Sequence, residues 1–153
     1  MTNSEDRPKE GKGVELSRIL NRDLFLHLLD LEVKRARRYQ NFLCLLTLNL
    51  RQFSNNSDGW SPQTCYQTLG DLLRVEIRES DILGSVGENQ MVVLLPYADQ
   101  LAGGNAKTRF ESVLKYFDFR SKGYEVIIEQ ISFPMQGTNT IDLLKKVFGP
   151  GVS

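Results

Sequence analysis

The sequence predicts an α+β fold with a ferredoxin-like βαββαβ core, an added N-terminal helix and a short C-terminal helix. Two observations lead to this prediction. Compact apolar runs alternate with longer segments in which apolar residues recur every three or four positions, and turn-forming residues separate them. After the first helix, the segments read strand, helix, strand, strand, helix, strand, which predicts a mainly antiparallel sheet with helices on one face. Many unrelated domains share this order, so it does not identify a function.

Length and charge narrow the possible classes of protein. The chain has 153 residues, of which 41% are hydrophobic, and this suits one domain with a sizeable core. Its 19 basic and 19 acidic residues cancel, so no overall field would hold nucleic acid or an anionic membrane. The longest apolar run, residues 42–46, is far below the roughly 20 residues that span a bilayer, and the N-terminus has no signal-peptide core. We therefore expect a cytoplasmic protein that neither inserts into a membrane nor binds nucleic acid.

The first helix is expected from residue 17 to about residue 39, after a polar tail of residues 1–13 with little to bury. Its leucines recur at the spacing of one helical face: Leu20, Leu24, Leu28 and Leu31. The end of the helix is strongly basic: Lys34, Arg35, Arg37 and Arg38. These cations complement the negative end of the helix dipole.

Four apolar segments are expected to form strands: residues 42–50, 82–86, 91–95 and 124–131. The second and third are separated only by a short turn, which is typical of a β-hairpin. Three further segments have helical spacing: residues 65–79, 101–117 and 140–148. Residues 55–59 have the composition of a loop. The last helix is stopped by Gly149, and residues 150–153 form a C-terminal tail.

The hairpin turn and the residues before it carry the most specific signal. The turn reads Gly87, Glu88, Asn89, Gln90 and Met91, and Arg78 and Asp81 stand in an Arg-x-x-Asp element five residues before it. This arrangement resembles the GGDEF domain of diguanylate cyclases, with a rewritten catalytic turn. Residues 16–25, 32–38 and 48–53 are similar to further motifs of that family. The resemblance implies a nucleotidyl cyclase type of core and a degenerate GGDEF domain over residues 14–149.

The departures from the family pattern fall on its active site. The resemblance implies a reaction that joins two GTP molecules with the help of two metal ions, which need anionic oxygen ligands. Neutral Asn49 and cationic Arg51 occupy positions where the family has acidic residues on the first core strand. The acidic pair of the turn is replaced by Asn89 and Gln90, and its second glycine by Glu88. We therefore expect no catalytic residues, no bound metal and no cyclase activity.

Two further elements of the family pattern are not matched. The guanine-reading asparagine corresponds to Ser57, and the chain stops before the lysine and arginine that clamp the triphosphate in the family's last helix. With only two cysteines and one histidine, the chain offers no Cys/His metal cluster in compensation. No cofactor is expected.

The Arg78 and Asp81 pair is retained, and the resemblance implies that it binds cyclic di-GMP. In the family, the guanidinium makes forked bonds to a phosphate or a guanine edge, and the carboxylate accepts guanine N–H groups. Arg35 is a candidate for a supplementary phosphate contact, from the same or a facing domain. The alternatives also stand: Arg78 ends a helix, Asp81 caps a turn, and Arg35 is a solvated surface cation.

Two binding functions follow, and the sequence offers no set of residues for an enzyme of another kind. The first is a catalytically inactive signalling domain that binds cyclic di-GMP through Arg78 and Asp81 and acts as a receptor. The second is a pseudo-enzyme that acts only as a protein–protein interaction or dimerisation module, without binding nucleotide. In both, a protein partner or a second copy of the chain is expected.

Overall fold

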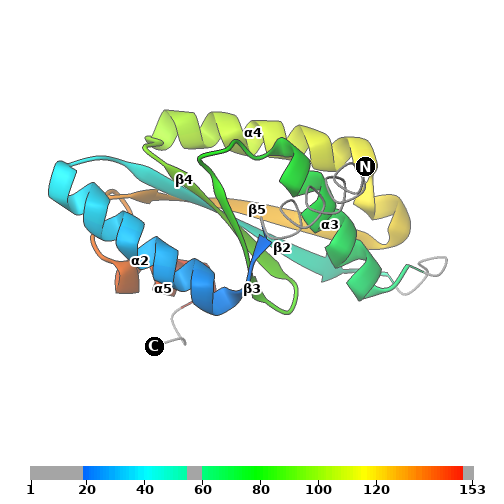
Figure 1. Cartoon of the computed structure of the whole chain (residues 1–153). Coiled ribbons are helices and arrows are strands. Elements are labelled where there is room, and N and C mark those ends of the chain that lie inside the picture. The colour runs from blue at the N-terminus through cyan, green and yellow to red at the C-terminus, as the bar shows by residue number, and fades with distance from the viewer. Residues whose placement is uncertain (1–18, 55–59, 150–153) are drawn as a thin grey trace, which may run out of the picture.

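The computed structural model describes residues 19–54 and 60–149. A twisted five-stranded sheet forms the centre of the molecule, and helices cover both of its faces (Figure 1). Both predicted tails, the predicted loop of residues 55–59 and the residue matched to the guanine reader lie outside the described residues. In the described part of the chain, no helix is both long and apolar enough to cross a membrane.

The sheet confirms the predicted α+β fold and its βαββαβ core. It contains β1 (Ile19–Leu20), β2 (Leu43–Gln52), β3 (Ile82–Gly87), β4 (Gln90–Pro96) and β5 (Tyr124–Phe133). The strand order is β1-β3-β4-β2-β5. All neighbours pair antiparallel except β1 and β3, which are parallel.

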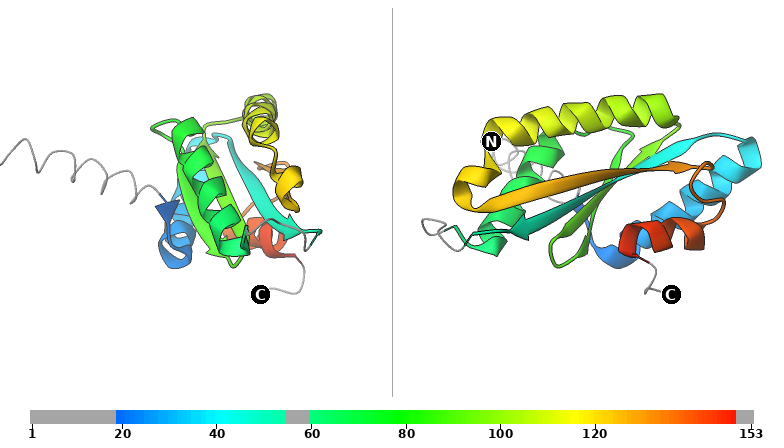
Figure 2. Two further views of the ribbon diagram at one scale, coloured as in Figure 1. Left: turned by 90° about the vertical axis from the view of Figure 1, so that its right-hand side faces the viewer. Right: turned by 180° about the vertical axis from the view of Figure 1, so that it is seen from behind.

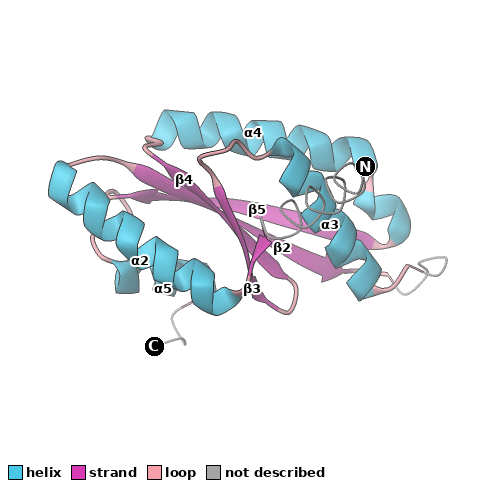
Figure 3. Ribbon diagram, viewed as in Figure 1, coloured by secondary structure: helices cyan, strands magenta, loops and turns pink. Residues whose placement is uncertain are grey.

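In the part of the chain that the structure describes, four α-helices and one short 3-10 helix, η1 (Phe119–Lys122), surround the sheet (Figure 3). The α-helices are α2 (Arg22–Tyr39), α3 (Pro62–Glu76), α4 (Gln100–Phe117) and α5 (Thr140–Phe148). Each begins after a residue whose side chain accepts a hydrogen bond from a backbone N–H of the first turn: Asn21, Ser61, Asp99 and Asn139. These caps satisfy donors that have no partner within the helix, so the local sequence fixes where each helix starts.

The helices of the predicted βαββαβ core pack on one face of the sheet, as expected, and the added helices cover the other face. Figure 2 shows α3 and α4 on one side and α2 and α5 on the other, and the buried side chains form two clusters to match. Alternate residues of β2 enter different clusters: Leu46 and Leu48 pack under α3 and α4, whereas Leu45 packs under α2 and α5. A strand that is apolar at consecutive positions needs cover on both faces.

The first helix differs from its prediction. It begins at Arg22, because Ile19 and Leu20 form β1 and pair with Leu83 and Gly84 of β3. The helix face that packs on the sheet is also different: Phe25, Leu29, Val33 and Ala36. Leu24 and Leu31 lie outside this face and are 44% and 47% exposed. The predicted helix is therefore present, but Leu24 and Leu31 belong to a second stripe on α2 that faces mostly outward.

Candidate functional site

Arg78 and Asp81 lie in the short turn that connects α3 to β3. The backbone N–H of Arg78 donates a hydrogen bond of 2.9 Å to Oδ2 of Asp81, and the backbone N–H of Asp81 donates to the Arg78 carbonyl at 3.0 Å. Arg78 is exposed and Asp81 is partly exposed. The turn-capping role considered for Asp81 is therefore present, and it fixes the carboxylate next to the base of the Arg78 side chain.

The two side chains line one open, largely polar pocket of about 270 Å³. The pocket lies between the α3–β3 turn, the end of β4 and the first half of α4, and Tyr97, Asn105 and Arg109 also line it. The structure thus brings the two retained residues together in a hollow that a small polar ligand can enter.

Arg109 adds a second guanidinium to this pocket, and the sequence interpretation missed it. Its Nε lies 3.3 Å from a carboxylate oxygen of Glu76 at the end of α3. Four residues of α4 at helical spacing face the pocket: Ala102, Asn105, Ala106 and Arg109. That spacing of small and polar residues was the available signal, but it becomes meaningful only when α4 is placed beside the α3–β3 turn.

Arg35 lies beside this pocket and not within it. Its Nη1 donates a hydrogen bond of 3.4 Å to the hydroxyl of Tyr97, and its Nη2 lies 3.3 Å from the Glu32 carboxylate. The Tyr97 hydroxyl and the Glu32 carboxylate raise the pKa of Arg35, so it stays cationic. Arg35 and Tyr97 line a second, shallow hollow that shares Pro96 and Tyr97 with the pocket. Arg35 is therefore connected to the candidate site through one side chain.

The rewritten turn joins β3 to β4 as expected. Glu88 and Asn89 form a two-residue exposed turn, and the strand register shifts between Ser85 and Gly87. The Asn89 carbonyl accepts a hydrogen bond of 2.8 Å from the backbone N–H of Leu50 on β2. This bond holds the hairpin tip against β2, and the Glu88 and Asn89 side chains are exposed.

The last two residues of the turn have structural partners. The side-chain amide of Gln90 donates a hydrogen bond of 3.0 Å to the Val147 carbonyl near the end of α5. Met91 is 2% exposed and packs in the cluster under α3 and α4. On the α3 side, the Tyr66 hydroxyl donates to the Gln90 carbonyl at 2.7 Å, and burial raises the pKa of this tyrosine. Contacts from helices on both faces of the sheet hold the turn.

The Glu125 carboxylate on β5 is paired with two arginines, Arg51 and Arg120. The guanidinium of Arg51 on β2 contacts the Glu125 carboxylate on β5, and Arg120 reaches the same carboxylate at 3.2 Å. Asn49 lies opposite Gln90 in the strand register. Among residues 19–54 and 60–149, no group of three or more acidic, histidine or cysteine side chains is placed to hold a metal ion.

Comparisons with known proteins fit this architecture. The sequence model described as "Diguanylate cyclase, GGDEF domain" matches residues 15–140. The sequence matches none of the curated proteins with which it was compared.

Solved structures show the same fold. A DGC protein from Thermotoga maritima aligns with a TM-score of 0.69 and 18% identity, over 88% of this chain and 93% of that one. The GGDEF domain of PA1120 (TpbB or YfiN) from Pseudomonas aeruginosa gives 0.72 and 20%, over 85% and 80%. The GGDEF domain of DgcB from Caulobacter crescentus, in complex with c-di-GMP, gives 0.69 and 14%, over 85% and 79%. With the family match over most of the sequence, these likenesses lead to one conclusion: the chain belongs to the GGDEF diguanylate cyclase family.

Proposed function

We propose that this chain is a catalytically inactive GGDEF domain that binds cyclic di-GMP in the Arg78/Asp81 pocket and acts as a cytoplasmic receptor. One observation carries the proposal: the retained arginine and aspartate line the same polar pocket, together with Arg109. The DgcB domain, which shares the fold, was solved with c-di-GMP, and this makes the ligand a reasonable one to test.

The chemistry of the pocket suits a phosphate-containing guanine ligand. Two guanidinium groups can make forked, charge-assisted hydrogen bonds to phosphate oxygens. Asp81 already accepts one hydrogen bond from the Arg78 backbone, but a carboxylate has about four acceptor positions. It can therefore also accept the N–H groups on a guanine edge.

Several observations support the loss of catalysis. Mg²⁺ prefers anionic oxygen ligands, and the residues at the expected metal positions, Asn49 and Asn89, are uncharged. The amide of Gln90 is engaged with α5, and Arg51 holds the nearby Glu125 carboxylate in an ion pair. The groups that a metal would need are thus either neutral or already bound to a cation.

Thermal unfolding with added cyclic di-GMP tests the proposal. Ligand at a hundredfold excess over its dissociation constant adds ~2.7 kcal/mol to the free energy of unfolding, which for a domain of this size raises the melting temperature by roughly 5–10 °C. Cyclic di-AMP at the same concentration is the control, because it has the same phosphates without guanine. An unchanged melting temperature with cyclic di-GMP would contradict the receptor function.

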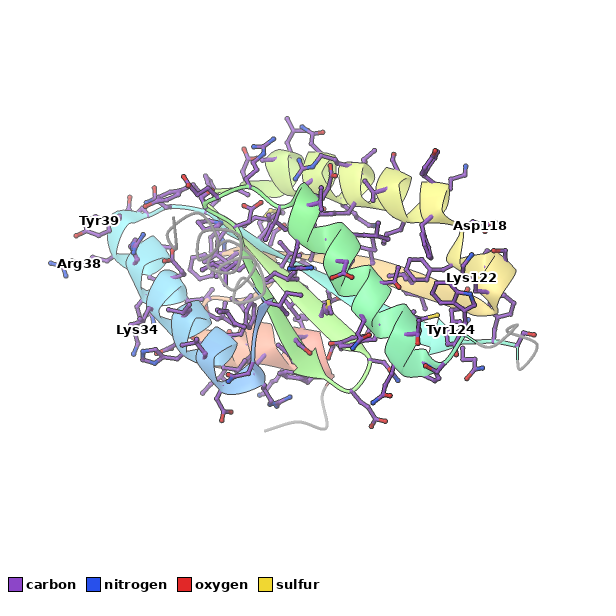
Figure 4. All side chains as sticks on the ribbon, turned by 45° about the vertical axis from the view of Figure 1, so that its right-hand side comes forward. Lys34, Arg38, Tyr39, Asp118, Lys122 and Tyr124 are labelled. Carbon is purple, nitrogen blue, oxygen red and sulfur yellow. The ribbon has the colours of Figure 1, made fainter. Side chains whose placement is uncertain are left out.

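A specific observation favours the second candidate, a protein interaction module. The outward stripe of α2 exposes Leu24 and Leu31, and the helix ends in a basic segment with Lys34, Arg38 and Tyr39 at its exposed end (Figure 4). An apolar stripe beside a basic cluster fits an acidic amphipathic partner. A SiaD cyclase that contains this fold was solved in complex with its activator SiaC, which makes a protein partner reasonable to test.

A further inference from the structure

Tyr97 has an unusual combination of backbone and exposure. It follows Pro96 at the end of β4 and has a φ of 62°, in the left-handed region that bulky residues rarely adopt. Its side chain does not enter the core, and the residue is 61% exposed. Glycine or asparagine would suit this backbone better, and neither packing nor backbone preference explains an aromatic residue there. Non-glycine residues in such conformations occur more often at functional sites.

The position of Tyr97 points to a role for its ring. Tyr97 lines the pocket that contains Arg78 and Asp81, and it also lines the hollow that contains Arg35. Its hydroxyl accepts the hydrogen bond of 3.4 Å from Arg35, and the Glu32 carboxylate lies 3.3 Å from the same guanidinium. Tyr97 therefore lies between the candidate site and the second hollow, and Arg35 holds its hydroxyl.

We propose that the Tyr97 ring is the stacking surface for a purine base bound in the Arg78/Asp81 pocket, and that Arg35 is a positioning residue that holds this ring. The inference rests on the proposed function. Aromatic side chains commonly stack on nucleobases, whereas carboxylates and guanidinium groups recognise their edges and phosphates. Among the described residues that line the pocket, Tyr97 is the aromatic one, and therefore the one that can stack on a base.

Calorimetric titration of three Tyr97 variants with cyclic di-GMP tests the stacking role. Loss of a base–aromatic stack lowers affinity by about 5- to 150-fold, so Tyr97→Leu is expected to bind that much more weakly. Tyr97→Phe keeps the ring but loses the contact with Arg35, so it is expected to bind more weakly than wild type and more tightly than Tyr97→Leu. Tyr97→Gly relieves the left-handed backbone, so it is expected to melt at the same or a higher temperature while binding more weakly. A loss of affinity without a loss of stability separates a ligand contact from misfolding.

A double-mutant cycle tests the positioning role of Arg35. If Arg35 acts by holding the Tyr97 hydroxyl, Arg35→Ala weakens binding in the wild type but has little further effect in Tyr97→Phe. Equal effects of Arg35→Ala in both backgrounds would overturn this role and assign Arg35 a direct ligand contact.

The outcomes for the proposed function and for this inference are distinct. Equal affinity in wild type and Tyr97→Leu, with binding that still depends on Arg78, would overturn the stacking inference and leave the receptor function intact. Absence of any binding by the wild-type chain would overturn both.

Discussion

The carboxylate of Asp81 accepts a hydrogen bond of 2.9 Å from the backbone N–H of Arg78, which closes the turn between α3 and β3. Asp81 therefore combines two roles that were considered as alternatives, a structural cap and a candidate ligand contact. The two roles respond differently to substitution, because the cap needs only an acceptor whereas guanine recognition needs a charged one.

The first prediction separates these roles. Asp81→Asn keeps an oxygen acceptor for the Arg78 amide and is expected to preserve the free energy of unfolding. It is expected to weaken cyclic di-GMP binding by about 1.5–3 kcal/mol, the usual contribution of hydrogen bonds to charged groups. Asp81→Ala loses the cap as well and is expected to cost ~1 kcal/mol in stability. Urea unfolding and calorimetry of both variants check this; an Asp81→Asn variant with wild-type affinity would show that Asp81 is only a cap.

The second prediction concerns Gln90, whose amide donates to the Val147 carbonyl at 3.0 Å. Gln90→Glu restores the acidic residue of the family but removes this donor and places a negative charge at the carbonyl end of α5. The expected cost is about 1–2 kcal/mol in the free energy of unfolding, measured with urea. Glu88→Gln in the exposed turn is the control and is expected to have little effect. A fully stable Gln90→Glu variant would argue against the importance of this contact.

The third prediction is that the purified chain makes no cyclic di-GMP from GTP with Mg²⁺ or Mn²⁺. Metal-assisted phosphoryl transfer needs its carboxylate ligands together, and Asn49, Asn89 and Gln90 are neutral. Reverting Asn89 or Gln90 alone to the acidic residue is expected to restore no activity. Product formation is followed by chromatography, with an active cyclase assayed in parallel. Product that survives rigorous purification would refute the loss of catalysis.

The fourth prediction tests the packing of α4, which contributes Arg109 to the pocket. A Cβ atom added at Gly103 would lie 2.5 Å from the Cys44 sulfur and 2.6 Å from the Gln130 amide nitrogen. Gly103→Ala is therefore expected to lower stability by about 1–3 kcal/mol, because α4 must shift from the sheet.

The adjacent glycine provides a matched control for this effect. A Cβ at Gly104 would meet only the Gln130 side-chain oxygen, at 3.7 Å. Gly104→Ala is expected to be neutral or to stabilise the helix by up to about 1 kcal/mol. Similar melting temperatures for the two variants would show that α4 is not closely packed at Gly103.

The sequence predicted those elements of the fold whose bounds depend on neighbouring residues. The β3–β4 hairpin and α5 were expected within one or two residues, because a short turn and clear caps define them. β1 could not be predicted, since Ile19 and Leu20 become a strand only by pairing with β3, far along the chain. The core face of α2 was also missed, because leucine spacing alone does not show which of two apolar stripes faces the sheet.

The candidate site was predictable only in part, for a related reason. Arg78 and Asp81 belong to one local turn, so their motif could be recognised in the sequence. Arg109 and Tyr97 reach the same pocket from other elements, and neither stands in a local pattern that indicates a ligand. Arg35 was a candidate for a supplementary phosphate contact, and its hydrogen bond to Tyr97 could not be read from the sequence because Tyr97 follows it by 62 positions.

Calorimetric titration of cyclic di-GMP into the wild-type chain and Arg78→Ala tests the central claim most directly. Loss of a forked, charge-assisted contact is expected to cost about 2–4 kcal/mol, or roughly thirty- to a thousand-fold in affinity. Arg78→Lys is expected to lose almost as much affinity, because an ammonium group cannot make the two parallel hydrogen bonds of a guanidinium. Arg37→Ala, which removes the same charge from the exposed side of α2, is the control and should bind like wild type. Equal affinity in wild type and Arg78→Ala, or no binding heat in either, would contradict the receptor function.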